Sequence, residues 1–313
     1  MSDGLTLGPV LHIAGAEVRV GTCSWTDKTL VKDADWYPKR SMSAAERLAF
    51  YGERFPVVEA DSTYYRPPSL QLTGGWAERT PEGFRMNVKA YSLMTGHPTK
   101  PDTLWPDIAE ALDPETADKR NVYPHHLPDD AVDEVWHRFV DALGPLHESG
   151  RLGAVLLQYP PWFTPKRANR DELARARARL GDVPACVELR SPLWFGKDDL
   201  DRTLRWLSDH DLALVSVDAP KVSKLPRLAA ATTDLAVVRF HGRADDTWSA
   251  RTTTAAERFR YLYDKRQLRP WVGRVAELAQ EAREVHVLMN NCFQDYGVRN
   301  AADMTDLLAA AAD

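Results

Sequence analysis

Eight short stretches rich in β-branched and apolar residues recur along the chain, and longer amphipathic stretches separate them. The longer stretches have apolar positions at the 3.6-residue period of a helix, and Ser43 precedes one of them as a candidate N-cap. Strands that alternate with helices form a parallel sheet, so the pattern predicts an α/β protein. The predicted strands lie at residues 18–25, 57–65, 84–90, 152–159, 185–190, 212–218, 235–241 and 285–291.

The number of these units favours one closed barrel. Eight strand–helix units match a (β/α)8 TIM barrel, and a chain of 313 residues can form one such domain. An open doubly wound sheet is the alternative, but the glycine-rich phosphate loop typical of that fold does not follow the first predicted strand. We therefore expect a flexible N-terminal arm over residues 1–17 and a single barrel domain over residues 18–313.

The third and fourth predicted strands are separated by a much longer segment than the others. Residues 91–150 begin with a stretch rich in Pro, Asp and Thr and end with an amphipathic stretch that predicts a helix. A long insertion in a compact domain is usually a lid, a binding loop or a disordered segment. Because this one leaves the carboxyl end of a strand, where barrel enzymes have their active sites, we favour a lid. A mobile surface insertion is the alternative.

The composition is that of an ordinary globular protein, and it narrows the range of partners. Hydrophobic residues make up 44% of the chain and charged residues 27%, and the formal net charge of -5 does not favour a surface that coats nucleic acid or an anionic membrane. Without a secretory signal pattern or a run of apolar residues long enough to span a bilayer, we expect a cytoplasmic protein with no membrane partner. The 3 cysteines have no zinc-site spacing and suit reduced thiols.

Polar residues occupy alternate positions near the end of most predicted strands. Side chains alternate between the barrel interior and the helix layer, so placing the apolar neighbours outward directs the polar residues inward. The carboxyl ends of the strands then form a charged mouth on the face where barrel enzymes have their chemistry. The residues predicted to face inward are Cys23, Glu59, Asp61, Asn87, Lys89, Gln158, Cys186, Glu188, Arg190, Ser216, Asp218, Arg239, His241, Asn290 and Cys292, with Arg19 and Arg85 nearer the floor in structural roles.

The stretch VVRFHGR, residues 237–243, gives the strongest indication of a ligand. Its apolar start suits a packed strand, whereas its basic end suits an open cleft. Phosphate sites in this fold often form after the seventh and eighth strands, and guanidinium groups match phosphate or carboxylate oxygens two at a time. We therefore predict that Arg239, Arg243 and His241 bind an anion. Tyr64, in the segment STYYRPPS, is a candidate for stacking on a base or sugar, with loop packing as the alternative.

The charged mouth also has a purely structural interpretation. Its acidic residues are roughly balanced by its lysine and arginines, so an ion-pair network that orders the barrel and binds nothing is the alternative. Cys23 and Cys292 lie at the ends of strands that a closed barrel makes neighbours. These two cysteines are therefore candidates for redox or metal chemistry, and the alternative is that they are small core residues.

Several short motifs resemble the domain of unknown function 72 family, also called YecE-like. In chain order they are VRVGTCSW, FPVVEADSTYYRPPS, WAERTPEGFRMNVKA, LGAVLLQYPPWF, CVELRSPLWF, VVRFHGR, RYLYDKRQL with Trp271, and MNNCFQDYGVRNA, and they cover most of the chain. The resemblance implies a (β/α)8 barrel with an acidic and basic mouth and no established activity. This barrel is similar to those of sugar isomerases and apurinic endonucleases, which is a likeness of fold only.

The resemblance also implies which residues form the polar site. Cys23 stands where a serine is usual, and Cys292 stands where a histidine or a similar residue tends to follow the asparagine pair. The inward residues are poor in histidine compared with metal-dependent isomerases and endonucleases, which puts a multi-metal site in doubt. The residues that match the family pattern are Glu59, Lys89, Glu188, Arg190, Arg239, His241 and Asn291, with Asp218 beside them.

Three hypotheses for function follow. The first is a hydrolase-like enzyme acting on a phosphate-containing substrate, such as a nucleic acid or a sugar phosphate. The second is glycoside chemistry with Glu59 and Glu188 as the pair, which requires carboxyl groups about 5 to 9.5 Å apart. The third is a non-catalytic protein that binds nucleic acid or a phosphometabolite. Under the first, Glu59, Glu188, Asp218 and His241 are catalytic, and Lys89, Arg190, Arg239, Arg243, Asn290, Asn291 and Tyr64 bind substrate. No motif indicates a cofactor. The sequence does not determine whether a divalent metal binds or which oligomeric state the protein adopts.

Overall fold

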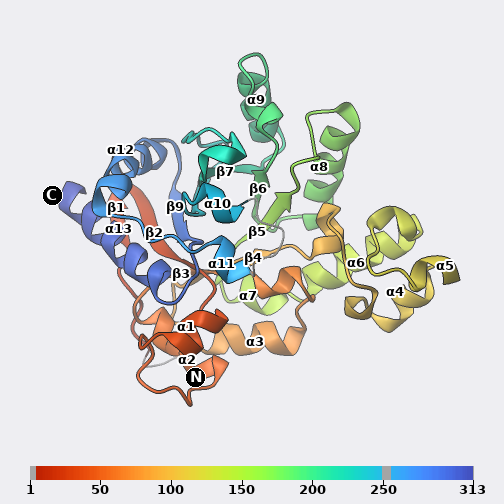
Figure 1. The fold of residues 1–313 in the computed structure, drawn as a ribbon, viewed down its shortest axis with the longest axis horizontal. Coiled ribbons are helices and arrows are strands. Elements are labelled where there is room, and N and C mark those ends of the chain that lie inside the picture. Colours follow the sequence, from red (N-terminus) through yellow and green to blue (C-terminus); the bar gives the residue numbers. More distant parts are fainter. Residues whose placement is uncertain (1–4, 249–254, 313) are drawn as a thin grey trace.

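A closed barrel of parallel strands forms the centre of the protein, as predicted (Figure 1). The computed structural model describes residues 5–248 and 255–312. Strands β2 to β9 follow one another around the barrel in chain order, and pairing of β2 with β9 closes it. The strands are β1 (Leu11–Ile13), β2 (Ala16–Cys23), β3 (Val57–Ala60), β4 (Arg85–Lys89), β5 (Leu152–Tyr159), β6 (Ala185–Leu189), β7 (Ala213–Asp218), β8 (Leu235–Phe240) and β9 (Glu284–Met289).

Helices connect the strands and cover the outside of the barrel. Among the described residues, no helix combines the length and the apolar character needed to cross a membrane. The α-helices are α1 (Lys28–Asp33), α2 (Ala44–Gly52), α3 (Leu70–Glu78), α4 (Pro106–Glu110), α5 (Pro114–Ala117), α6 (Asp129–Asp141), α7 (Gly144–Glu148), α8 (Arg167–Leu180), α9 (Leu200–Asp209), α10 (Asp245–Trp248), α11 (Ala255–Arg258), α12 (Lys265–Glu281) and α13 (Tyr296–Ala312). The 3-10 turns are η1 (Ser62–Tyr64), η2 (Ser92–Thr95), η3 (Pro101–Thr103), η4 (Pro124–His126), η5 (Pro192–Phe195) and η6 (Lys221–Ser223).

The start of helix α2 follows from its sequence. The Ser43 side chain accepts a hydrogen bond from the Glu46 backbone N–H, and the Glu46 carboxylate accepts one from the Ser43 N–H. This reciprocal capping satisfies two backbone donors that the first helical turn leaves open. The predicted N-cap at Ser43 is confirmed.

The expected N-terminal arm differs from the structure. Leu11–Ile13 forms β1, which pairs antiparallel with the first residues of β2, so the sheet begins at residue 11. Ala14 and Gly15 both have positive φ, as in the tight two-residue turns that join antiparallel strands. Leu11 and Ile13 pack against the core, and this apolar contact holds the segment on the barrel. Residues 1–4 of the expected arm, and residues 249–254 and 313 of the expected barrel, lie outside the described part.

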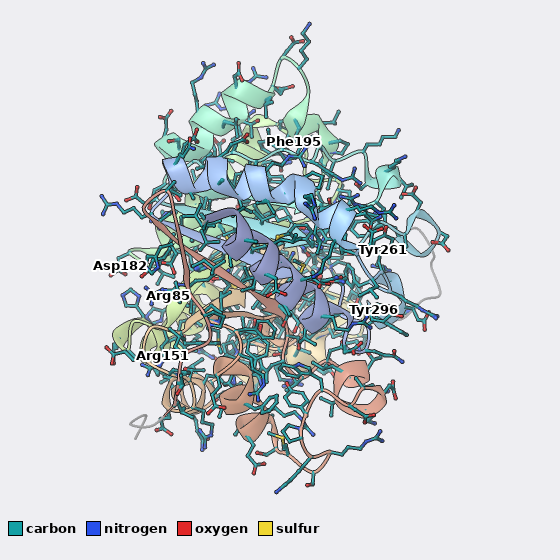
Figure 2. The ribbon with its side chains drawn as sticks, turned by 90° about the vertical axis from the view of Figure 1, so that its left-hand side faces the viewer. Arg85, Arg151, Asp182, Phe195, Tyr261 and Tyr296 are labelled. Atoms are coloured by element: carbon teal, nitrogen blue, oxygen red, sulfur yellow. The ribbon has the colours of Figure 1, made fainter. Side chains whose placement is uncertain are left out.

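The barrel interior has three layers along its axis. At the floor, Glu284 accepts hydrogen bonds from Arg19 Nε at 2.6 Å and from Arg85 Nε at 3.1 Å, which supports the structural roles expected for both arginines. The middle layer is apolar and built from small or medium side chains such as Ala154 and Val215. The third layer is the mouth. Figure 2 labels Arg85 near the floor end and Tyr261 and Tyr296 near the mouth end.

The insertion between β4 and β5 lies mainly beside the barrel. Figure 1 shows α4, α5 and α6 extending away from the strands. Arg179 of α8 binds Asp133 of α6 at 2.5 Å, and Arg138 of α6 binds Asp107 of α4 at 2.5 Å, so ion pairs join the insertion to the barrel and hold it together. The insertion contacts the mouth through His97, whose ring is 5.3 Å from that of Tyr64. The lid expected over residues 91–150 stays a prediction.

Candidate functional site

The innermost group of the mouth is Arg239, at the end of β8. Its guanidinium binds Glu59 of β3 at 2.6 Å through one terminal nitrogen and Glu188 of β6 through the other. All three side chains are buried. Although burial by itself disfavours the charge, Glu59, Cys23 and Glu188 hold the pKa of Arg239 well above its usual range. The site therefore contains a permanent cation fixed between two carboxylates.

Glu188 has the largest number of polar neighbours in this network. Its carboxylate accepts hydrogen bonds from Arg190 Nε, from Arg239 and, at 2.9 Å, from Gln158 Nε2. Burial alone raises the pKa of a carboxyl group, but Arg190, His241 and Arg239 outweigh it and hold the pKa of Glu188 well below its usual range. Glu188 is consequently ionised at neutral pH and does not provide a proton. A glycosidase acid at this position is disfavoured.

His241 is a neutral ring in this setting. Burial lowers its pKa to about 4. With the Asn290 amide nitrogen donating to Nδ1 at 2.8 Å, the ring proton resides on Nε2, which lies 3.2 Å from Glu188 Oε1. The ring nitrogen that could accept a proton is therefore occupied, so the arrangement disfavours a general-base role for His241, which was predicted to be catalytic.

The network still contains polar atoms without partners. Within the described residues, Glu59 Oε2 and Arg239 Nε are buried and make no hydrogen bond. Buried polar atoms are normally paired, by protein, water or ligand. The alternative of a fully self-satisfied ion-pair network therefore describes only part of the mouth.

A small cavity of about 80 Å³ opens above Arg239. This is well below the volumes of roughly 300–1,000 Å³ typical of drug-sized ligand sites. It therefore suits a single small polar group, with the rest of a ligand lying outside it. The residues that line it are Asp27, Asp61, Tyr65, Lys89, Gln158, Arg190, Arg239, Phe259, Asn290 and Cys292.

Asp61 and Lys89 line the cavity, and the pKa of each is shifted towards neutrality. Burial, assisted by Glu59, raises the pKa of Asp61 to about 6. Burial and the neighbouring Arg239 lower the pKa of Lys89 to about 8. A carboxyl and an amine of this kind exchange protons readily near pH 7, as catalytic groups must.

The cations of the cavity differ in how far they are committed to protein partners. Arg239 is held by two carboxylates, whereas Arg190 binds Glu188 through Nε. In the part of the chain that the structure describes, Lys89 makes no ion pair, and its Nζ lies 4.4 Å from the centre of the Tyr64 ring. Lys89 and the terminal nitrogens of Arg190 are therefore the cationic groups best placed to meet an incoming anion.

Asp218 and Ser216 do not face the mouth, and their predicted inward orientation is wrong. Asp218 is paired with Phe240, an outward residue that packs on Trp271 of α12. Its carboxylate accepts hydrogen bonds from Trp271 Nε1 at 2.8 Å and from Tyr263 Oη at 3.0 Å. The inward positions of β7 hold small apolar side chains such as Val217, which leave room for the large charged groups of neighbouring strands.

Arg243 and Asn291 also lie behind the mouth. Arg243 binds Asp218 through two nitrogens, at 2.8 and 2.6 Å. Asn291 donates hydrogen bonds to the Tyr261 carbonyl oxygen and to Asn300, both at 2.8 Å. Both side chains therefore join loops and helices around β8 and β9. Neither residue lines the cavity, although we predicted that both bind substrate.

The cysteines predicted to face inward do so, but as protonated thiols. Cys23, Cys186 and Cys292 belong to or pack against the apolar interior of the barrel. Burial raises the pKa of each thiol above its usual range. A thiolate is the form that binds metals and exchanges with disulfides, so this environment suits small core residues.

Two residues that line the cavity, Asp27 and Phe259, were not predicted from the sequence. A divalent metal was left open, and within residues 5–248 and 255–312 no group of three or more His, Cys, Asp or Glu side chains is arranged to hold a metal ion. Asp27 follows β2 by four residues, so the rule that loops after barrel strands line the mouth could have identified it.

Comparison with known proteins gives consistent matches over nearly the full length. The family described as "Protein of unknown function DUF72" matches residues 19–313. The UPF0759 protein YunF of Bacillus subtilis (strain 168) is 28% identical over 297 residues, covering 93% of this chain and 94% of YunF. A crystal structure of a DUF72 family protein from Enterococcus faecalis V583 is 25% identical with a TM-score of 0.74, covering 93% of this chain and 95% of the other. One from Thermotoga maritima MSB8 is 27% identical with a TM-score of 0.72, covering 93% and 99%.

Proposed function

This chain belongs to the DUF72 family, whose description leaves substrate and reaction open, and we propose that it binds and hydrolyses a small phosphate-containing molecule at the carboxyl end of the barrel. The observation that carries the proposal is the set of groups around the cavity. Lys89 and Arg190 supply positive charge, and Asp61 supplies a carboxylate with a pKa of about 6. Phosphoryl transfer depends mainly on positioning and charge stabilisation, which such a set can provide.

Each group has a distinct role in the proposed reaction. Lys89 and Arg190 bind the phosphoryl oxygens, and Asp61 accepts a proton from the attacking water. The water oxygen forms the new P–O bond, the ester P–O bond breaks, and the leaving alcohol takes a proton from solvent. Arg239 and Glu188 hold Arg190 and Gln158 in place and act as positioning residues.

The first test measures hydrolysis of p-nitrophenyl phosphate and bis(p-nitrophenyl) phosphate between pH 5 and pH 9. Because Asp61 must be ionised to accept a proton and its pKa is about 6, the rate should fall as the pH drops below 6. Asp61→Asn should lower kcat by about 100-fold, the smaller end of the range for a lost general base. Arg190→Met and Lys89→Met should weaken binding of inorganic phosphate.

A matched control shows whether the effect of Asp61→Asn is specific to the cavity or follows from the loss of any carboxylate. Asp35→Asn makes the same chemical change at an exposed side chain paired with Arg40, and should leave kcat unchanged. Phosphate binding without turnover would reject hydrolysis and select the non-catalytic binding protein. If neither native protein nor variants bind inorganic phosphate, the phosphate site itself is wrong.

A further inference from the structure

Four rings form a continuous aromatic rim along one side of the mouth. They are Tyr65 and Tyr64 after β3, His97 after β4 and Trp162 after β5, and we call them the aromatic rim. Successive ring centres are 5.1, 5.3 and 6.2 Å apart. The two ends are open to solvent, with Tyr65 61% and Trp162 63% exposed. Exposed aromatic rings that lie next to one another are typical of surfaces that bind a partner or a ligand.

The rim is continuous with the cavity. Tyr65 lines the cavity itself, and Lys89, which also lines it, lies over the Tyr64 ring. A ligand whose small charged group fills the cavity can therefore extend past Tyr65 onto the rim. The 80 Å³ volume holds only that charged group, so the rim is available to the remainder of the ligand.

The four rings of the rim carry no positive charge of their own. Burial, with Lys89 and Arg190 nearby, lowers the pKa of His97 to about 4, so this ring is neutral at pH 7. Each phosphate of a polynucleotide would need a cation along the track for tight binding. The rim instead suits an uncharged ring, whose flat face stacks on an aromatic side chain.

We infer that the ligand is a phosphate monoester of a neutral ring compound, a sugar phosphate or a mononucleotide, whose phosphate enters the cavity while its ring stacks on the aromatic rim. This inference rests on the proposed function and specifies its substrate class. The shared chemistry is one phosphate joined to one uncharged ring system. Whether the ring is a sugar or a base is decided by the probes of the test.

The test compares dissociation constants measured by calorimetry for ethyl phosphate, glucose 6-phosphate and adenosine 5′-monophosphate. In the native protein, at least one ring-bearing ester should bind about tenfold more tightly than ethyl phosphate, the gain expected for one stacked ring. Tyr65→Leu and Trp162→Leu should reduce that ratio towards one. Tyr65→Phe, which keeps the ring, should preserve it.

The outcomes separate this inference from the proposed function. If ethyl phosphate binds in a manner that depends on Lys89 and Arg190, but neither ring-bearing ester gains affinity, the aromatic rim has no such role and the phosphate site stands. If no phosphate compound binds at all, the proposed function itself is rejected, and the inference about the aromatic rim is rejected with it. Leu72→Ala, a change at an exposed apolar residue of α3, serves as the control and should leave the ratio unchanged.

Discussion

Arg239 shows how one residue organises the mouth of the barrel. Its two terminal nitrogens join carboxylates from β3 and β6, so three strands that are far apart in the sequence meet at one guanidinium. Arginine suits this position because its planar group can bind two carboxylates at once and keeps its charge when buried. A lysine has a single ammonium and cannot reproduce this geometry.

Removing this cation should destabilise the protein strongly. Arg239→Met leaves Glu59 and Glu188 buried beside an apolar side chain, and breaking a buried ion pair in this way costs about 3–5 kcal/mol. The free energy of unfolding, measured by urea denaturation, should fall by that amount. Arg40→Met removes an exposed ion pair with Asp35 and should change it by less than about 1 kcal/mol. Equal effects of the two changes would show that the buried network does not contribute as argued.

Asp218 shows where reasoning from single residues fails. Its acidic side chain at a strand end predicts a place in the mouth, yet it accepts hydrogen bonds from Tyr263 and Trp271 in the outer layer. In β8 the apolar and polar residues alternate clearly, and the inward orientation of Arg239 and His241 was predicted correctly. In β7 both sets of alternate positions accept apolar side chains, so the alternation does not determine the orientation.

At the scale of the element, β5 contains an irregularity that depends on a glycine. The register between β4 and β5 shifts between Met86 and Val88, as at a β-bulge. A Cβ atom on Gly153 would lie 2.3 Å from Asn87 Oδ1 and 2.9 Å from His286 Cε1. Both neighbours belong to the hydrogen-bonded floor of the barrel, so they have little freedom to move.

A matched pair of glycine substitutions tests this irregularity. Gly153→Ala should lower the free energy of unfolding by about 1–3 kcal/mol, the usual cost of overpacking a core. Gly273 lies on the solvent-exposed side of helix α12, away from both helix ends, and an added Cβ there meets nothing within 4 Å, so Gly273→Ala is the matched change. It should raise the free energy of unfolding by about 0.5–1 kcal/mol because alanine favours the helix. Thermal denaturation monitored by circular dichroism shows whether each variant is less or more stable than the native protein. Stabilisation by Gly153→Ala would contradict the bulge argument.

At the scale of the whole molecule, charge restricts the partners. The formal net charge is -5, and around the cavity the described residues include the carboxylates of Asp27, Asp61, Glu59 and Glu188 beside the cationic side chains of Lys89, Arg190 and Arg239. Two of those cations bind carboxylates, so few are available to neutralise a phosphate backbone. The proposed site takes one anionic group, and the overall charge of the molecule opposes a polyanion.

Weak binding of polynucleotides is therefore expected. A fluorescein-labelled single-stranded 20-mer DNA should bind with a dissociation constant above about 100 µM at 0.15 M salt, beyond the usual range of non-specific nucleic-acid binding. Fluorescence anisotropy at several salt concentrations measures it. Micromolar affinity that decreases steeply as salt increases would contradict this prediction and would indicate that the protein binds nucleic acid.

The eight barrel strands, their order and most of the inward residues could be predicted from the sequence, because apolar periodicity and side-chain alternation are local properties of the chain. Strand β1 was missed because a three-residue strand with an Ala14–Gly15 turn has too little pattern to identify. The contact between Glu188 and Arg239, the outward orientation of Asp218 and the small size of the cavity became evident only in the folded barrel. Those features depend on how eight strands pack together, and local periodicity contains no information about distances between strands far apart in the chain.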